Sequence, residues 1–198
     1  MSLDALALAE PGFARVLKTH GRPEPRLSEP GYESLLRTIV GQQVSVAAAR
    51  SMWARLIDRF GSPPDLTGLA GAEDEALRGA GLSRQKAGYA RSLAAQVLAG
   101  ELDLAALPQD DEEAIALLTR VKGIGRWSAE IYLLFAEGRG DVWPAGDLAV
   151  QVEIGRLLGL AERPSEKQLR ALAEAWRPHR GAAAVLAWHS YNNVGTAL

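Results

Sequence analysis

Apolar residues recur every three or four positions along most of this chain, in segments rich in Ala and Leu. This spacing places the apolar side chains on one face of an α-helix. No stretch alternates apolar and polar residues convincingly over the length of a strand. The pattern therefore predicts an all-α protein, with helices at about residues 3–18, 31–41, 45–60, 73–79, 84–99, 111–120, 126–137, 147–158, 166–176 and 181–193.

Glycine and proline residues separate the predicted helices. Ser83 and Ser165 are typical N-caps, and Gln168, three residues after Ser165, completes a capping-box pattern. The longest irregular stretch, residues 138–146, leads directly into Asp147. Loops of this length inside a compact domain are often functional, so Asp147 is a candidate functional residue.

One short motif occurs twice. Residues 77–84 resemble residues 121–128, with the G-x-G of Gly79 and Gly81 opposite the G-x-G of Gly123 and Gly125. In each copy, the glycines are expected to turn the chain from one helix into a second, cationic helix. Two copies are too few for a solenoid. They indicate two similar hairpins that could hold two stretches of one phosphate backbone.

Composition excludes several kinds of site. The chain has 198 residues, of which 47% are hydrophobic and 23% charged, as in an ordinary globular protein. Cysteine is absent, which excludes disulfides, zinc-thiolate sites and cysteine-ligated iron–sulfur clusters. With no signal-peptide pattern and no apolar run of membrane-spanning length, we expect a cytoplasmic protein without membrane contact.

The charges are segregated along the chain, although the net charge is −2. Residues 78–91 and 114–129 each contain Lys and Arg, and six acids lie between them in residues 101–113. Residues 78–91 contain no acid. This distribution has two interpretations that fit equally well: a basic face that binds nucleic acid, and an ordinary solvated face.

The strongest motif is the second glycine pair, with its flanking cations Lys122 and Arg126. Gly123 and Gly125 can adopt positive φ and let a ligand approach the backbone. The N–H groups that begin the following helix suit a phosphate oxygen. Such contacts would bind DNA without reading its sequence. A simple glycine joint between two helices is the alternative interpretation.

Together, these motifs resemble those of a known protein family. The hairpin at residues 121–129, followed by Pro144-Ala145-Gly146 and Asp147, is similar to the helix-hairpin-helix and Gly/Pro-rich loop of HhH-GPD DNA glycosylases. Residues 39–47, IVGQQVSVA, resemble a second signature of the alkylated-base (AlkA) type, 3-methyladenine DNA glycosylase II. The resemblance runs from about Tyr32 to Val194 and includes no N-terminal β-rich domain.

The resemblance implies a two-lobed helical fold with a cleft between the lobes. All 198 residues would form one glycosylase domain, with one lobe at about 35–135 and the other from about 1–34 plus 136–198. The hairpin and Asp147 would both border the cleft. The implied activity is hydrolysis of the N-glycosidic bond of alkylated bases such as 3-methyladenine and 7-methylguanine, which begins base excision repair.

In this family the residue at Asp147 is the catalytic carboxylate. A desolvated carboxylate stabilises the positive charge that develops on the sugar and orients the attacking water. An aspartate after glycine, before an apolar helix, is also a common N-cap, and both roles can coexist. Relatives that cut the strand carry a lysine where this chain has Trp127, so no lyase step is expected.

The resemblance also assigns the residues around the flipped base. Trp127, Trp188 and Tyr32 would form an aromatic pocket for a cationic base, with Ile131 where the family has tyrosine. Gln43 would fill the gap left in the duplex, the alternative being an exposed turn residue. Trp53 and Trp176 fit core packing. Backbone binding is assigned to Gly123, Gly125, Lys122, Arg126, Ser128, Gly81, Ser83 and Lys86.

No cofactor is required by this chemistry. Hairpins of the family hold a monovalent cation on backbone carbonyls, which implies Na⁺ or K⁺ at Thr119, Val121 and Ile124. The ion would bridge a DNA phosphate. The three histidines show no ligand spacing and fit surface or packing roles.

The expected partner is double-stranded DNA with alkylated bases, bound by a monomer at the nucleoid. The alternatives are a non-catalytic helix-hairpin-helix DNA-binding module, a glycosylase for other damaged or mismatched bases, and an all-α adaptor.

Overall fold

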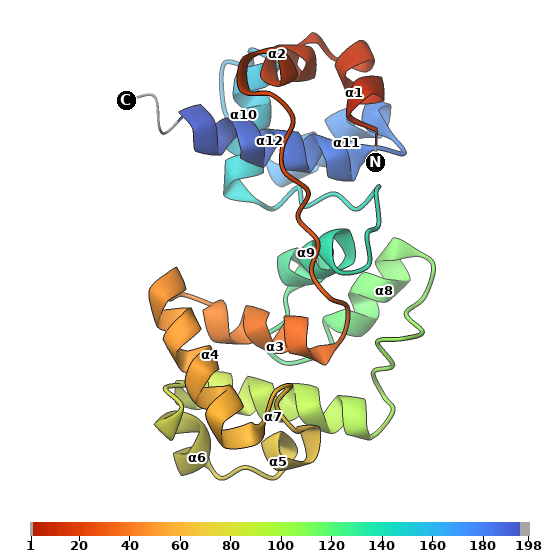
Figure 1. Cartoon of the computed structure of the whole chain (residues 1–198). Helices are drawn as coiled ribbons and strands as arrows, with labels where there is room; N and C mark the ends of the chain where they lie inside the picture. Colours follow the sequence, from red (N-terminus) through yellow and green to blue (C-terminus); the bar gives the residue numbers. More distant parts are fainter. Residues whose placement is uncertain (1, 195–198) are drawn as a thin grey trace. The chain divides into compact units, whose positions relative to one another are not determined.

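The computed structural model describes residues 2–194, with side chains through Asn193. Every regular element in that range is helical, which confirms the predicted all-α class. The elements are α1 (Leu3–Ala9), α2 (Pro11–His20), α3 (Tyr32–Gly41), α4 (Val46–Phe60), α5 (Leu66–Ala70), α6 (Asp74–Gly79), α7 (Arg84–Leu98), α8 (Asp111–Leu118), α9 (Arg126–Phe135), α10 (Leu148–Leu157), α11 (Glu166–Ala173), the 3₁₀ helix η1 (Glu174–Trp176) and α12 (Arg180–Val194) (Figure 1).

The chain divides into two compact units. The terminal unit comprises Met1–Leu27 and Leu133–Leu198, and the central unit comprises Ser28–Tyr132. The family resemblance implied corresponding limits at about residues 35 and 135. One boundary between the units falls inside α9. The predicted cleft between two lobes stays a prediction.

In the terminal unit, α12 packs against α1, α2 and α10. Its buried alanines, among them Ala183 and Ala187, let these helices approach closely. The aromatic residues Phe13, Trp143 and Trp176 fill the core, with Trp176 edge-on to both others at 5.1 and 5.6 Å between ring centroids. Trp176 is 5% exposed, which confirms its predicted packing role.

In the central unit, α7 packs against α3, α5 and α6 (Figure 1). The core consists of leucine, isoleucine and alanine side chains such as Leu36, Leu77 and Leu93. Trp53 is 8% exposed, and the Arg37 guanidinium lies 3.9 Å from its ring centroid. This confirms the packing role of Trp53 and adds a cation–π contact at the edge of the core.

One predicted helix was wrong in detail, and one short helix was missed. The predicted helix 3–18 is two helices, because Pro11 begins α2 and the preceding Glu10 is extended, with φ −140°. Proline has no N–H to donate and disfavours helical geometry at the residue before it. The short α5 was not predicted. Asp65 caps it by accepting the Gly68 N–H at 2.5 Å, and a helix of five residues is too short to show apolar periodicity.

No described helix is both long and apolar enough to span a bilayer.

Candidate functional site

Asp147 ends the loop between α9 and α10 and is the N-cap of α10. Its Oδ1 accepts the Val150 N–H at 2.9 Å. The indole Nε1–H of Trp188, on α12, donates to the same oxygen at 3.1 Å. The N-cap interpretation is therefore confirmed, and a second donor holds the carboxylate in one orientation. Both donors belong to the terminal unit.

The loop before Asp147 is fixed at several points. Asp141 accepts from Arg180 at 3.0 Å and from Arg177 at 2.6 Å. Gly181 N–H donates to Gly140 O at 2.9 Å, and a Cβ on Gly181 would lie 2.7 Å from that oxygen. These contacts tie the loop to the start of α12, so the segment that positions Asp147 is rigidly supported.

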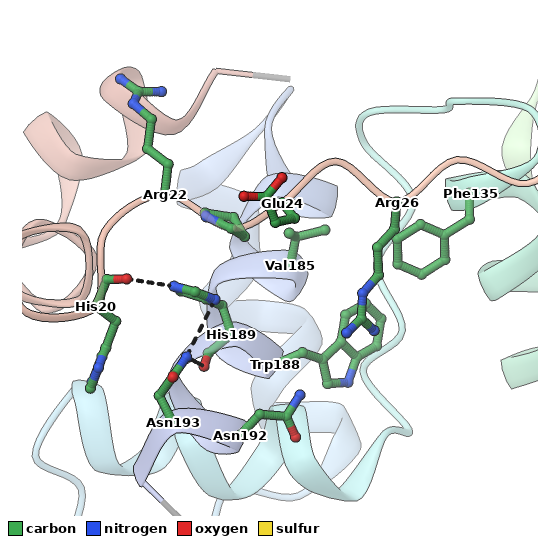
Figure 2. A pocket seen from close by; sticks show the side chains of 11 residues that line it. His20, Arg22, Glu24, Arg26, Phe135, Val185, Trp188, His189, Asn192 and Asn193 are labelled. Atoms are coloured by element: carbon green, nitrogen blue, oxygen red, sulfur yellow. Dashed lines mark hydrogen bonds between the residues drawn. The ribbon is translucent and has the colours of Figure 1, made fainter. Parts of the chain in front are cut away.

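Trp188 also lines a cavity in the terminal unit, with a volume of about 430 Å³ (Figure 2). Phe135 lies beside it, with 5.7 Å between the ring centroids. Figure 2 shows the Arg26 side chain alongside these two rings, and Asn192 and His189 on the α12 side of the cavity. The cavity therefore joins an aromatic wall to polar and cationic groups.

The histidines fit packing roles. His189 Nε2 lies 3.1 Å from His20 O, and its ring is edge-on to that of His20 at 6.3 Å. Among the described residues, no group of three or more His, Cys, Asp or Glu could hold a metal ion.

The α8–α9 hairpin of the central unit is built around Gly123. This residue has φ +88°, and a Cβ there would lie 2.2 Å from the Tyr89 ring. Only glycine meets both requirements. Gln42 Nε2 donates to Gly123 O at 2.8 Å, and Ile124 N–H donates to Val121 O at 3.0 Å. The hairpin is thus held by residues from α7 and from the end of α3.

The two cations of the hairpin differ. Lys122 is exposed. Arg126 binds Glu130 at 2.9 Å and makes a bidentate contact with Glu112, with Nη1 at 2.8 Å from Oε2. The hydrogen bond that Arg126 donates to Glu112 raises the pKa of Arg126 further above its usual value. Glu130 is 1% exposed, so Arg126 neutralises a buried carboxylate as well as bordering the predicted phosphate site.

The repeated motif also forms the α6–α7 turn, but in a different register from the one that the sequence suggested. Gly81 has φ +95° and lies three residues before Arg84, which begins α7. Gly123 lies three residues before Arg126, which begins α9. Gly81 therefore corresponds to Gly123, two residues away from the alignment that the sequence suggested. Gly79 is still inside α6.

Ser83 and Lys86, which were predicted to bind phosphate, are engaged inside the central unit. Ser83 Oγ accepts the Lys86 N–H at 3.2 Å and so caps α7. Lys86 Nζ donates to Val40 O at 2.8 Å, in the last turn of α3. An ammonium group there pairs with a helix-end carbonyl and the negative end of the helix dipole. Burial lowers the pKa of Lys86. The position of its ammonium gives no support to a phosphate contact.

Gln43 lies in the turn between α3 and α4 and is exposed. Among the described residues it is the one non-glycine residue with positive φ, at 54°. Such a backbone costs on the order of 1 kcal/mol and is often found at functional sites. The wedge role stays a prediction, and the turn presents this side chain to solvent.

The other predicted pocket residues lie in the central unit. Trp127 is 46% exposed at the start of α9, Ile131 is half-buried on the same helix, and Ser128 is buried. Tyr32 donates its hydroxyl to Pro64 O at 2.5 Å, and burial raises its pKa. Because Trp188 belongs to the terminal unit, the grouping of these residues around one base stays a prediction.

Sequence reasoning missed the residues that support the site. Gln42 and Tyr89 hold Gly123 from positions 81 and 34 residues earlier in the chain. Phe135 and Arg26 line the cavity beside Trp188. No local pattern marks such partners, although the Gln42-Gln43 pair before a capped helix was a usable signal of an unusual turn.

The chain is similar in sequence to known proteins. The family model described as "HhH-GPD superfamily base excision DNA repair protein" matches residues 36–178. DNA-3-methyladenine glycosylase 1 of Schizosaccharomyces pombe is 32% identical over 184 residues, which cover 89% of this chain and 80% of that protein. A putative DNA-3-methyladenine glycosylase of Bacillus subtilis is 27% identical over 80% of this chain, which spans 58% of that relative's length.

Solved structures are similar as well. A DNA-3-methyladenine glycosidase from Bacillus halodurans superposes with a TM-score of 0.87 and 30% identity, covering 96% of this chain and 89% of that one. The S. pombe 3-methyladenine DNA glycosylase in complex with abasic DNA gives a TM-score of 0.77 and 29% identity, covering 93% and 91%. The chain therefore belongs to the HhH-GPD superfamily of base excision DNA repair proteins.

Proposed function

We propose that this protein is a monofunctional DNA glycosylase that releases alkylated bases, such as 3-methyladenine and 7-methylguanine, from duplex DNA by hydrolysis. The observation that carries the proposal is the Asp147 carboxylate, which accepts from Val150 N–H and Trp188 Nε1–H. Trp188 in turn lines an aromatic-walled cavity. The names of the relatives support the substrate class. The protein would act on nucleoid DNA in the cytoplasm.

Asp147 would act on the sugar. Breaking an N-glycosidic bond builds positive charge on the deoxyribose, and a carboxylate with a fixed orientation stabilises that charge without reorganising. The same group can orient or deprotonate the water that attacks. Capping α10 also places the carboxylate at the N-terminus of that helix.

Trp188 would contact the base. In DNA, 3-methyladenine and 7-methylguanine are cationic, and an indole face attracts cations. Their weakened glycosidic bonds break with little protonation of the leaving base. The reaction therefore needs no dedicated general acid. Gln43 would occupy the space that the flipped base leaves in the duplex.

The α8–α9 hairpin would bind the DNA backbone through the N–H groups that begin α9, aided by Lys122. A Na⁺ or K⁺ ion fits the same hairpin, because backbone carbonyls are hard oxygen donors and each has two lone pairs. Val121 O uses one lone pair for Ile124 N–H, and Thr119 lies at the end of α8, where carbonyls lack partners within the helix. The ion would link these carbonyls to a phosphate.

A strand-cutting step would need an amine to form a Schiff base. Trp127 stands at the family's lysine position and has none. We therefore propose hydrolysis alone, with the abasic strand left intact.

The test is single-turnover base release from methylated duplex DNA, comparing the wild type with Asp147→Asn. Asparagine caps a helix as well as aspartate, so the fold should be preserved. Losing the charge should slow release by about a hundredfold to a thousandfold. Asp110→Asn is the matched control, because Asp110 caps α8 in the same way, with Glu113 N–H at 2.9 Å, and should release bases at the wild-type rate.

Other outcomes would change the proposal. Release by Asp147→Asn at the wild-type rate would remove Asp147 from the chemistry. A wild type that binds DNA but releases no base from a broad panel of lesions would be a helix-hairpin-helix binding module. Strand nicking, or an adduct trapped by borohydride, would contradict the monofunctional mechanism.

A further inference from the structure

The α6–α7 turn of the central unit lies against arginine side chains from α4. Arg55 Nε donates to Ala80 O at 3.1 Å, and its Nη1 donates to Ser51 Oγ at 2.8 Å. A Cβ on Gly81 would lie 2.5 Å from Arg55 Nη2, so a glycine is needed for the guanidinium to rest on the turn. Arg59 Nη1 lies 3.9 Å from the position of a Cβ on Gly79.

Two more arginines flank the turn in sequence. Arg78 is exposed in the last turn of α6. Arg84 begins α7, and its side chain is 89% exposed. We call these four residues, from three helices, the arginine cluster: Arg55, Arg59, Arg78 and Arg84.

The cluster has little negative charge to balance it. Arg55, Arg59 and Arg78 take part in none of the ion pairs found among residues 2–194. Arg84 lies 3.8 Å from Asp74, but Asp74 already binds Arg91 at 2.5 Å. The Arg91 hydrogen bond is the main reason for the lowered pKa of Asp74. No acidic residue occurs in the sequence from 76 to 100.

This contrasts with the hairpin itself, where Arg126 is bound by two glutamates. Like charges held together repel one another, and a bound polyanion relieves that repulsion. A guanidinium presents its donors in a plane that matches two phosphate oxygens. Four such groups around one turn are therefore suited to a phosphodiester backbone.

We propose that the arginine cluster is a second binding site for the phosphates of duplex DNA, separate from the α8–α9 hairpin. The site supplies part of the affinity that does not depend on sequence. The inference rests on the proposed function insofar as DNA is the substrate, and it assigns the contact to guanidinium groups, in place of the Ser83 and Lys86 side chains.

The position of the cluster limits where it can contact the duplex. α4 begins three residues after Gln43, and Arg59 lies thirteen residues into that helix. At 1.5 Å per residue this is about 20 Å. At 3.4 Å per base pair, this length corresponds to about six base pairs, so we expect the cluster to contact phosphates about that far from those nearest the start of α4.

The test combines Arg59→Gln, Arg78→Gln and Arg84→Gln in one variant and measures binding to undamaged duplex DNA over a series of salt concentrations. Arg55 is left in place because it supports the turn. The matched control is Lys18→Gln, Arg163→Gln and Lys167→Gln, three exposed cations of the terminal unit, with the same change in net charge. Thermal unfolding confirms that both variants fold.

For three lost phosphate contacts, the slope of log K against log salt should become shallower by about two to three. Affinity at low salt should fall by about a hundredfold on the same basis. The control should keep the wild-type slope. Equal slopes for the cluster variant and the control would overturn the proposal, whether both are unchanged or both are reduced.

Base release is measured in parallel on the wild type and the control. A wild type that binds DNA and releases no base contradicts the proposed function, while the comparison of slopes still decides the arginine cluster. A wild type that does not bind duplex DNA contradicts both.

Discussion

The α6–α7 and α8–α9 turns of the central unit follow the same local path but differ where the second helix begins. In each, a glycine of positive φ is followed by a buried apolar residue, Leu82 or Ile124, and three residues after the glycine an arginine starts the next helix. The residue between the buried apolar residue and the arginine is Ser83 in the α6–α7 turn and Gly125 in the α8–α9 turn. Ser83 Oγ accepts a helix N–H, whereas Gly125 has no side chain that could.

This difference separates two ways of binding an anion. A serine at the N-cap uses part of the hydrogen-bonding capacity of the helix start, so that turn must rely on the guanidinium groups around it. A glycine lets a phosphate approach the helix N–H groups closely. The cations show the same division, because Arg126 is paired with acids whereas Arg55, Arg59 and Arg78 are not.

The largest expected effect comes from Gly123→Ala. The substitution forces a side chain into positive φ, which costs about 1–2 kcal/mol, and places a Cβ 2.2 Å from the Tyr89 ring, for a further 1–3 kcal/mol. The free energy of unfolding in denaturant should fall by about 3 kcal/mol, and DNA affinity should fall with it.

Gly81→Ala is the matched control, because its φ is similar but its Cβ meets the flexible end of Arg55. Its loss should be smaller, because shifting the flexible Arg55 and Met52 side chains adds little to the cost of about 1–2 kcal/mol from the backbone. Equal losses at the two glycines would show that packing on Tyr89 adds nothing.

A smaller effect is expected for Gly125→Ser, which gives the α8–α9 turn the serine cap of the α6–α7 turn. A Cβ there meets nothing within 4 Å, so the fold should tolerate it. The free energy of unfolding should rise by a few tenths of a kcal/mol. DNA affinity should fall about tenfold, because the hydroxyl competes with one charge-assisted hydrogen bond to phosphate.

Titration of a fluorescent duplex measures this affinity. Gly71→Ser, at an exposed position after α5, is the control and should bind as the wild type does. Unchanged affinity in Gly125→Ser would refute close approach of phosphate at this residue.

The smallest effect on binding is expected for Ser83→Ala. Losing the cap should lower the free energy of unfolding by about 1 kcal/mol. DNA affinity, measured by the same titration, should stay unchanged, because the arginine cluster makes the contact. Weaker binding would restore the phosphate role that the sequence assigned to this hydroxyl.

The sequence was sufficient where a structural cause is local. Apolar periodicity located most helices, and Ser83, Ser165 and Asp147 were recognisable as caps because a cap acts within three residues. The glycine pairs indicated the two turns. Their correct register was not legible, because the pattern G-x-G does not say which glycine adopts positive φ.

Partners far apart in sequence could not be predicted. The Lys86 ammonium donates to Val40 O, which lies 46 residues away in the sequence. Gln42 donates to Gly123 O, 81 residues away. A cation in a basic segment looks the same in sequence whether it is paired with carboxylates, like Arg126, or takes part in no ion pair, like Arg78. Three-dimensional proximity decides that difference.

The double contact of Trp188 has a consequence for how the enzyme can evolve. One edge of its indole donates to Asp147, and the residue, which is proposed to contact the base, also lines the cavity of the terminal unit. A substitution there that adjusted which lesions fit would disturb the orientation of the carboxylate at the same time. Selection for a new lesion spectrum is therefore expected to act on other residues that line the cavity, such as Arg26 and Val185, while Trp188 stays constrained.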